Sequence, residues 1–228
     1  MSFFRPSSDR GASDRAAFDQ LRARMVRTQL EERGISDERV LDAMRWVPRE
    51  EFVGPDVRDV AYDDNPLPIG EEQTISQPYI VAIMLQHLTL HPSDRVLEIG
   101  TGSGYATALL ARLCKEVYSV ERHVSLAISA ESALARLGIH NVRVRVGNGT
   151  QGWAEYAPFN AILVSAATAE VPSPLFEQLQ EGGRMIVPVG PSSAQELQLI
   201  CKVEGHAEVS RLEGCRFVPL VSGGAGDP

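Results

Sequence analysis

One stretch, residues 95–105 (RVLEIGTGSGY), constrains the fold more than any other part of the chain. Its first half contains Val96, Leu97 and Ile99, as expected of a short strand that is buried on both faces. Glycines then occupy positions 100, 102 and 104, where they allow the backbone to bend sharply and to approach a ligand closely. A helical pattern follows over residues 105–114. A strand, a glycine-rich turn and a helix in this order predict the opening of a nucleotide-binding βαβ unit.

The spacing of these glycines distinguishes between two classes of cofactor. A dinucleotide fingerprint has the form G-x-G-x-x-G/A, and its last residue is small so that helix and strand can pack closely. Tyr105 occupies that place here, so the dinucleotide fingerprint fails. The chain has instead an acidic residue, Glu98, followed by G-x-G-x-G, which resembles the first motif of S-adenosylmethionine-dependent methyltransferases.

A second acidic residue should close the ribose site at the end of the next strand. Residues 115–120 predict that strand, and Glu121 ends it. Glu121 lies about 20 positions after Gly100, the separation expected for a ribose-binding carboxylate. Its carboxylate can accept hydrogen bonds from both ribose hydroxyls. The alternative is a generic nucleotide-binding α/β protein in which both acidic residues are solvated.

Composition and charge exclude several classes of protein. The formal net charge is −8 and no basic stripe is evident, which argues against a nucleic-acid partner and against a membrane surface. No apolar run approaches the ~20 residues of a membrane-spanning helix, and residues 1–14 lack the apolar core of a signal peptide. Cys114, Cys201 and Cys215 show no paired spacing and predict reduced thiols. We therefore expect a cytoplasmic monomer, without a metal site because the histidines lack ligand spacing.

The N-terminal part of the chain predicts helices that cover the nucleotide unit. Residues 1–15 contain little that can be buried and predict a disordered tail. Residues 16–33 have a helical pattern that a glycine ends, and Ser36 is expected to cap a second helix. Residues 48–53 predict one further helical turn. Two prolines and a glycine exclude a regular element from residues 61–70.

The C-terminal part alternates between strands and helices and then departs from that alternation. Two final strands, residues 196–203 and 208–220, are joined by a link so short that only antiparallel neighbours fit it. We therefore predict an α/β fold, a doubly wound, mostly parallel, Rossmann-like sheet with an antiparallel C-terminal hairpin and an N-terminal helical cover. Residues 16–228 are expected to form a single domain. Its parts are the helices and substrate loop (16–94), the core (95–220) and a flexible tail (221–228).

Several separated segments carry one further pattern. They are residues 47–53 (VPREEFV), 66–69 (PLPI), 74–79 (TISQPY), 96–105 (VLEIGTGSGY) and 216–220 (RFVPL). Together they resemble the family of protein-L-isoaspartate O-methyltransferases, from about residue 16 to residue 220. Many methyltransferases share the glycine motif, whereas its combination with PLPI and TISQP is far more specific. The resemblance implies transfer of a methyl group from S-adenosyl-L-methionine to the free carboxylate of L-isoaspartyl residues in damaged proteins and peptides. S-adenosyl-L-homocysteine is then the product, and repair proceeds through a succinimide.

The resemblance also implies which residues form the site. Ser76 is the implied active-site residue, whereas its position alone predicts a cap for the following helix. The cofactor is expected to contact Thr74, Ile75, Ser76, Glu98, Gly100, Thr101, Gly102, Ser103, Gly104, Glu121, Arg122, Asn148 and Gly149. The walls that hold the peptide substrate are expected at Leu67, Pro68, Ile69, Phe217, Val218 and Pro219.

The chemistry expected of such a site is modest. An isoaspartyl carboxylate has a pKa of about 4 and is already ionised at neutral pH, so it needs no general base. Ser76 is expected to donate a hydrogen bond to one carboxylate oxygen and to orient the other toward the methyl group. No Ser-His-Asp arrangement suggests that Ser76 is a covalent nucleophile.

Three positions depart from the family pattern. Asn148 stands where the family usually has an aspartate that contacts the adenine amine, which predicts weaker cofactor binding because the charge is lost. Asn160 stands where aspartate is common, and Glu72 where glycine is common. Two alternatives stay open. One is a small-molecule or RNA methyltransferase with the same cofactor site, and the other, suggested by Asn148 and Glu72, is an isoaspartyl-binding module without turnover.

Overall fold

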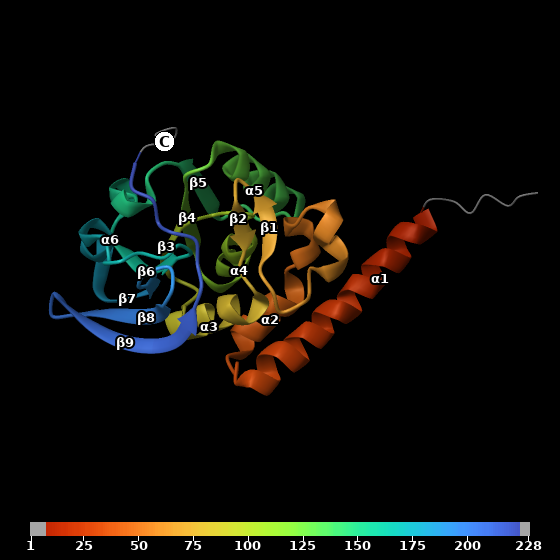
Figure 1. The fold of residues 1–228 in the computed structure, drawn as a ribbon, viewed down its shortest axis with the longest axis horizontal. Helices are drawn as coiled ribbons and strands as arrows, with labels where there is room; N and C mark the ends of the chain where they lie inside the picture. Colours follow the sequence, from red (N-terminus) through yellow and green to blue (C-terminus); the bar gives the residue numbers. More distant parts are fainter. Residues whose placement is uncertain (1–7, 224–228) are drawn as a thin grey trace, which may run out of the picture.

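The computed structural model describes residues 8–223, and a seven-stranded sheet forms its centre (Figure 1). The strands are β3 (Arg95–Ile99), β4 (Glu116–Glu121), β5 (Val142–Val146), β6 (Phe159–Val164), β7 (Leu179–Val189), β8 (Gln195–Val203) and β9 (His206–Cys215). Their order across the sheet is β5-β4-β3-β6-β7-β8-β9. The five strands β5, β4, β3, β6 and β7 run parallel to one another, and β8 and β9 add an antiparallel edge. The predicted mostly parallel sheet with an antiparallel C-terminal hairpin is confirmed.

Helices cover both faces of this sheet, as a doubly wound fold requires. One face packs against α3 (Pro78–Leu88), α4 (Tyr105–Leu113) and α5 (Val124–Arg136). The other packs against α6 (Ser173–Gln178) and two 3-10 turns, Gly149–Gln151 and Ala154–Tyr156. Successive residues of β3 alternate between the two cores, with Val96 on the first side and Leu97 on the second. This alternation explains why the strand is apolar at nearly every position.

The N-terminal helix is longer than predicted. Helix α1 (Ser8–Met25) continues through a π-helical turn (Val26–Leu30) and a 3-10 turn (Glu31–Arg33), and Gly34 ends it with a φ of 94°. Residues 8–15 of the predicted tail are therefore helical, as an N-terminal extension of the predicted helix. Residues 1–7 lie outside the described part of the chain. The first turns of α1 project beyond the rest of the molecule (Figure 1).

The second helix, α2 (Glu38–Trp46), begins one residue later than predicted. Its cap is Asp37, whose carboxylate accepts hydrogen bonds from the N–H groups of Arg39 and Val40, so the prediction of Ser36 as the cap is wrong. The Ser36 N–H donates instead to the side chain of Gln86 on α3 (2.7 Å). The predicted turn at residues 48–53 is confirmed as a 3-10 turn at Arg49–Phe52, and another follows at Pro55–Val60. Among the described residues, no helix combines the length and hydropathy of a membrane span.

A two-stranded hairpin stands where the sequence excludes a regular element. Strands β1 (Leu67–Gly70) and β2 (Gln73–Ile75) pair antiparallel, with Leu67 opposite Ile75. Proline is tolerated in β1 because each strand of a two-stranded sheet is an edge, where one N–H needs no partner. The hairpin brings residues 74–76 next to the glycine turn that follows β3.

Two strands at the C-terminal end also differ from the prediction. Gly182 and Gly183, a pair that usually marks a turn, lie inside β7, where the pairing with β6 is irregular. Strand β9 ends at Cys215, so residues 216–220 leave the sheet edge. There the Ala167 N–H donates to the Val218 carbonyl (2.8 Å), and the Leu220 N–H donates to the Ala167 carbonyl (2.6 Å). These bonds place residues 217–220 beside the carboxyl end of β6.

Replacing Gly104 with alanine will lower the free energy of unfolding by about 2–3 kcal/mol. Gly104 has a φ of 89°, and a Cβ there would lie 3.1 Å from the Cβ and 3.3 Å from the Cα of Ala130 on α5. Gly138→Ala is the matched control, because Gly138 has a φ of 68° but no atom within 4 Å of the added Cβ. It should lose only the backbone part, about 1 kcal/mol. Urea unfolding measures both, and equal losses would contradict a close contact between the glycine turn and α5.

Candidate active site

The winding direction of the sheet reverses between β3 and β6, and a cavity opens at the carboxyl ends of these two strands. The Ser165 N–H donates to the Ile99 carbonyl (2.8 Å) and joins the two strand ends. The cavity has a volume of about 400 Å³, within the range of small-molecule sites. Open α/β sheets bind their ligands at such a reversal point.

The glycine turn after β3 borders this cavity. Gly100 and Gly102 have φ angles of 90° and 53°, in the region that favours glycine. A Cβ on Gly102 would lie 3.3 Å from the Cδ1 atom of Ile69, so the β1–β2 hairpin packs directly over the turn. Residues 100–103 line the cavity, whereas Gly104 is outside its lining and packs against α5.

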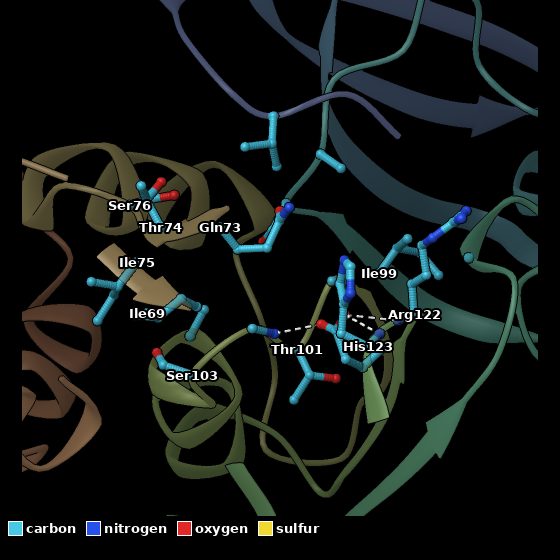
Figure 2. Close-up of a pocket in the computed structure, with 18 of the residues that line it drawn as sticks. Ile69, Gln73, Thr74, Ile75, Ser76, Ile99, Thr101, Ser103, Arg122 and His123 are labelled. Carbon is cyan, nitrogen blue, oxygen red and sulfur yellow. Dashed lines mark hydrogen bonds between the residues drawn. The ribbon is translucent and has the colours of Figure 1, made fainter. Parts of the chain in front are cut away.

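Glu121, at the end of β4, holds the other side of the turn. Dashed lines in Figure 2 mark hydrogen bonds between residues that line this part of the cavity. The Oε2 atom of Glu121 accepts from the Gly102 N–H (2.7 Å), and its Oε1 accepts from the N–H groups of Arg122 (2.8 Å) and His123 (2.9 Å). An ionised carboxylate offers about four lone-pair positions, so one position on Oε2 is left for a ligand. One ribose hydroxyl can donate a hydrogen bond to that position. A hydrogen bond from the second ribose hydroxyl to Glu121, as predicted, requires the Gly102 N–H to lose its bond to the same carboxylate.

Glu98, the acidic residue of the glycine motif, is not among the described residues that line the cavity. Its side chain is fully buried. Its Oε2 accepts from the hydroxyls of Thr107 (2.5 Å) and Ser119 (2.6 Å), and its Oε1 has no partner in the described structure. The carboxylate therefore joins β3 to the first turn of α4 and to β4. Burial raises the pKa of Glu98 to about 7, although the two hydrogen bonds act to lower it.

Glu98→Gln will stabilise the protein at pH 8 and weaken the dependence of its stability on pH. The folded-state pKa of Glu98, about 7, lies above the ordinary value of 4.5. Between these values the folded state binds a proton that the unfolded state lacks, so stability falls as the pH rises through this window. Above it, burial of the charged form costs at most about 3 kcal/mol, which the neutral amide avoids. Urea unfolding at pH 5 and pH 8 checks this, and parallel pH slopes for both proteins would contradict it.

A groove of about 1080 Å³ adjoins the cavity. It runs between the start of α3, residues 192–195 and residues 213–218. Four residues line both hollows, namely Thr74, Ser76, Ser165 and Val218. Two ligands, one in the cavity and one in the groove, would therefore meet at these four residues.

Ser76 lies between β2 and α3 at this meeting point. The cap position of α3 is Gln77, and the Asp64 carboxylate accepts the Tyr79 N–H there (3.2 Å), so the interpretation of Ser76 as a helix cap is wrong. Within residues 8–223 the Ser76 hydroxyl makes no hydrogen bond. In Figure 2, Ser76 and Thr74 lie across the cavity from Ile99. The hydroxyl is thus left for a ligand.

Most of the residues predicted for the site gather here. The cavity is lined by Ile69, Thr74, Ile75, Ser76, Gly100, Thr101, Gly102, Ser103, Glu121, Arg122, Gly149, Val218 and Pro219, and the groove by Phe217. Leu67 and Pro68 belong to β1 and line neither hollow within the described range. Ser165, Ala166, His123 and Leu220 also line the cavity, although the sequence did not identify them. Ser165 directly follows a predicted buried strand, the signal that identified Glu121.

Asn148 is engaged within its own turn. Its side-chain carbonyl accepts from the N–H (3.0 Å) and the hydroxyl (2.8 Å) of Thr150, and so caps the 3-10 turn Gly149–Gln151. The neighbouring Gly149 lines the cavity, and a Cβ on it would lie 2.5 Å from the Cγ2 atom of Ile99. At this place the glycine backbone, rather than the Asn148 side chain, lines the cavity.

The composition of the cavity fits an adenosine-containing cofactor. Glu121 offers a carboxylate oxygen to a ribose, and Ile99, Val120 and Leu220 offer apolar walls to a base. The site is bordered by an acid-flanked G-x-G-x-G turn and not by a dinucleotide fingerprint. This fold and this site define the class of S-adenosylmethionine-dependent methyltransferases with a Rossmann-like core.

Comparison with known proteins identifies the family within this class. The family model of protein-L-isoaspartate(D-aspartate) O-methyltransferase (PCMT) matches residues 21–225. Relatives named protein-L-isoaspartate O-methyltransferase from Syntrophobacter fumaroxidans and Methanoculleus marisnigri are 53% and 54% identical to the chain. The alignments cover 90% and 88% of this chain, and 95% and 91% of the relatives. The chain belongs to the protein-L-isoaspartate O-methyltransferase family.

Solved structures agree with this assignment. A homologue from Plasmodium falciparum, crystallised in complex with S-adenosyl-L-homocysteine, superposes with a TM-score of 0.78 at 29% identity. The match covers 88% of this chain and 98% of that one. Another solved protein-L-isoaspartate O-methyltransferase matches with a TM-score of 0.79 at 34% identity, over 90% of this chain and 66% of that one.

Proposed function

We propose that this chain transfers the methyl group of S-adenosyl-L-methionine to the free carboxylate of L-isoaspartyl residues in damaged proteins and peptides, which initiates repair through a succinimide. The observation that carries the proposal is the junction of the two hollows at Thr74, Ser76, Ser165 and Val218. The cavity suits the cofactor, and the groove, with a volume of about 1080 Å³, has room for a peptide segment. Family membership supports both assignments.

The residues of this chain have binding and positioning tasks in that reaction. S-adenosyl-L-methionine, when bound, supplies a methyl group on a positively charged sulfur, so the leaving group is neutral. The isoaspartyl carboxylate is ionised at neutral pH and needs no base. Ser76 donates its unpaired hydroxyl to one carboxylate oxygen, which leaves the other oxygen free to form the new O–C bond. The β1–β2 hairpin over Gly102 helps to exclude water from this point.

The segment after β9 offers main-chain contacts to the peptide. The Val218 carbonyl is engaged with the Ala167 N–H, whereas the Val218 N–H has no acceptor within residues 8–223. Both peptide groups of Phe217 are held by the side chain of Gln195 (3.1 and 2.6 Å). The segment is thus fixed in place with one donor available. Contacts of this kind recognise a backbone rather than a side chain, which favours wide sequence tolerance.

We further infer a cytoplasmic monomer that acts without a nucleic-acid or membrane partner. The net charge of −8 supports this, as do three free cysteines, of which Cys114 is buried. Sedimentation of the purified chain tests the oligomeric state.

One assay separates this function from its rivals. Labelled methyl from S-adenosyl-L-methionine is offered to an isoaspartyl peptide and to its normal aspartyl twin. The proposal predicts labelling of the isoaspartyl peptide alone, with a base-labile ester. Labelling that does not depend on the isoaspartyl linkage would favour a small-molecule or RNA methyltransferase. Peptide binding without cofactor affinity would favour a binding module.

A further inference from the structure

The β1–β2 hairpin supplies one wall of the cavity but is not part of the main sheet. It forms a separate two-stranded sheet, and a sheet of two strands is marginally stable by itself. Next to its tip, Ile69 packs on Gly102, and residues 73–76 continue along the cavity wall to Ser76. The cover that the hairpin forms over the cavity therefore depends on what holds the hairpin against the body of the protein.

The tip of the hairpin has an unfavourable backbone conformation. Gly70, Glu71 and Glu72 have φ angles of 94°, 50° and 56°. Glycine adopts such angles freely, whereas each of the two glutamates is disfavoured there by about 1 kcal/mol. Neither glutamate is buried, so packing does not compensate for the conformation. Two-residue hairpin turns with such angles favour asparagine and glycine, so a contact from outside the hairpin stabilises this tip of two glutamates.

Glu71 makes that contact, across the cavity mouth. The Ser125 hydroxyl, in the first turn of α5, donates to its Oε1 (2.6 Å), and the Nδ1 atom of His123 lies 3.7 Å from its Oε2. Glu71 is 44% exposed and His123 29% exposed, so the contact lies at the rim of the cavity. The N–H of the same His123 donates to Glu121, the carboxylate that is assigned to the ribose. Figure 2 shows the His123 side chain among the residues lining the cavity.

We propose that Glu71 is a positioning residue: by accepting from Ser125 and facing His123, it holds the β1–β2 hairpin closed over the bound cofactor and slows its dissociation. The inference rests on the proposed function, because it assumes that the cavity binds S-adenosyl-L-methionine and its product. In this proposal, Glu71, His123 and Ser125 connect the hairpin to the segment that binds the ribose. The resulting closure acts on the cofactor side, away from the Ser76 hydroxyl.

The test is the dissociation rate of S-adenosyl-L-homocysteine from the whole chain, measured by surface plasmon resonance, with kcat measured at saturating S-adenosyl-L-methionine. Ser125→Ala should speed dissociation about three- to tenfold, the effect of one hydrogen bond to a charged acceptor at a partly exposed site, without lowering kcat. Ser125→Thr keeps the hydroxyl and should restore the slow rate. Ser132→Ala is the matched control, because the Ser132 hydroxyl bonds only within α5, to the Ile128 carbonyl.

A double-mutant cycle shows whether Glu71 and Ser125 act together. Glu71→Ala should speed dissociation at least as much as Ser125→Ala, because it also removes the contact with His123. The double variant should be no faster than Glu71→Ala alone. Additive effects, an unchanged rate in Ser125→Ala, or a kcat that falls in step with affinity would overturn the proposal. If the unaltered chain binds no S-adenosyl-L-homocysteine at all, the proposed function itself fails. If it binds and only the variants show no effect, the hairpin contact alone is wrong.

Discussion

Ser76→Ala will lower kcat for an isoaspartyl peptide by about 10- to 100-fold and leave the KM for S-adenosyl-L-methionine nearly unchanged. The expected loss corresponds to one hydrogen bond to a charged group, about 1.5–3 kcal/mol. Ser76 lies at the junction of cavity and groove, and its hydroxyl, like those of Thr74 and Ser165, is unengaged in the described structure, so its removal leaves the fold intact. The carboxylate then binds with less fixed orientation toward the methyl group.

Steady-state rates with each substrate varied in turn measure this effect. Ser132→Ala serves again as the control, since its side chain is on the exposed face of α5. Full turnover in Ser76→Ala would show that the backbone alone orients the carboxylate. A loss expressed only in the KM for S-adenosyl-L-methionine would instead make Ser76 a cofactor residue.

Glu121→Gln will raise the dissociation constant of S-adenosyl-L-homocysteine about 10- to 100-fold. Glu121 accepts three backbone N–H bonds at 2.7–2.9 Å, and its remaining lone-pair position is directed to a ribose hydroxyl. An amide has one acceptor oxygen, and its NH₂ group would meet N–H donors. The glycine turn and the segment at 122–123 therefore lose part of their fixed arrangement, and charge-assisted hydrogen bonds become neutral ones.

Titration calorimetry of the purified variants measures the affinity. Glu131→Gln is a suitable control, since Glu131 is exposed on α5. Unchanged affinity in Glu121→Gln would contradict the placement of the ribose at the end of β4. A variant that binds normally but unfolds more easily would restrict Glu121 to a structural role.

The sequence predicts the central sheet well because its evidence is local. The buried strand at residues 95–99, the glycine turn and the acid after the next strand each follow from residue types at short spacing. The same holds for the antiparallel ending, which a short link between two strands implies. Elements that depend on distant partners are predicted less well. The β1–β2 hairpin is an example. Its prolines argue against regular strands, whereas in the structure the two strands pair and pack on the glycine turn.

The candidate site shows the same division. Residue type and spacing identified Glu121, and the family resemblance identified Ser76, but neither predicted which way side chains face. Glu98 proves to be buried against Thr107 and Ser119, because α4 and β4 supply hydroxyls that only the fold brings together. The contact of Glu71 with Ser125 joins residues 54 positions apart and leaves no sequence pattern. Contacts between residues so far apart in the sequence become visible only in the folded structure.

The crystal structure of the chain with S-adenosyl-L-homocysteine and an isoaspartyl peptide tests the central claim most directly. We expect the sulfur at the border of cavity and groove, and one oxygen of the isoaspartyl carboxylate at hydrogen-bonding distance, about 2.7 Å, from the Ser76 hydroxyl. A sulfur remote from that hydroxyl, or a peptide bound outside the groove, would contradict it.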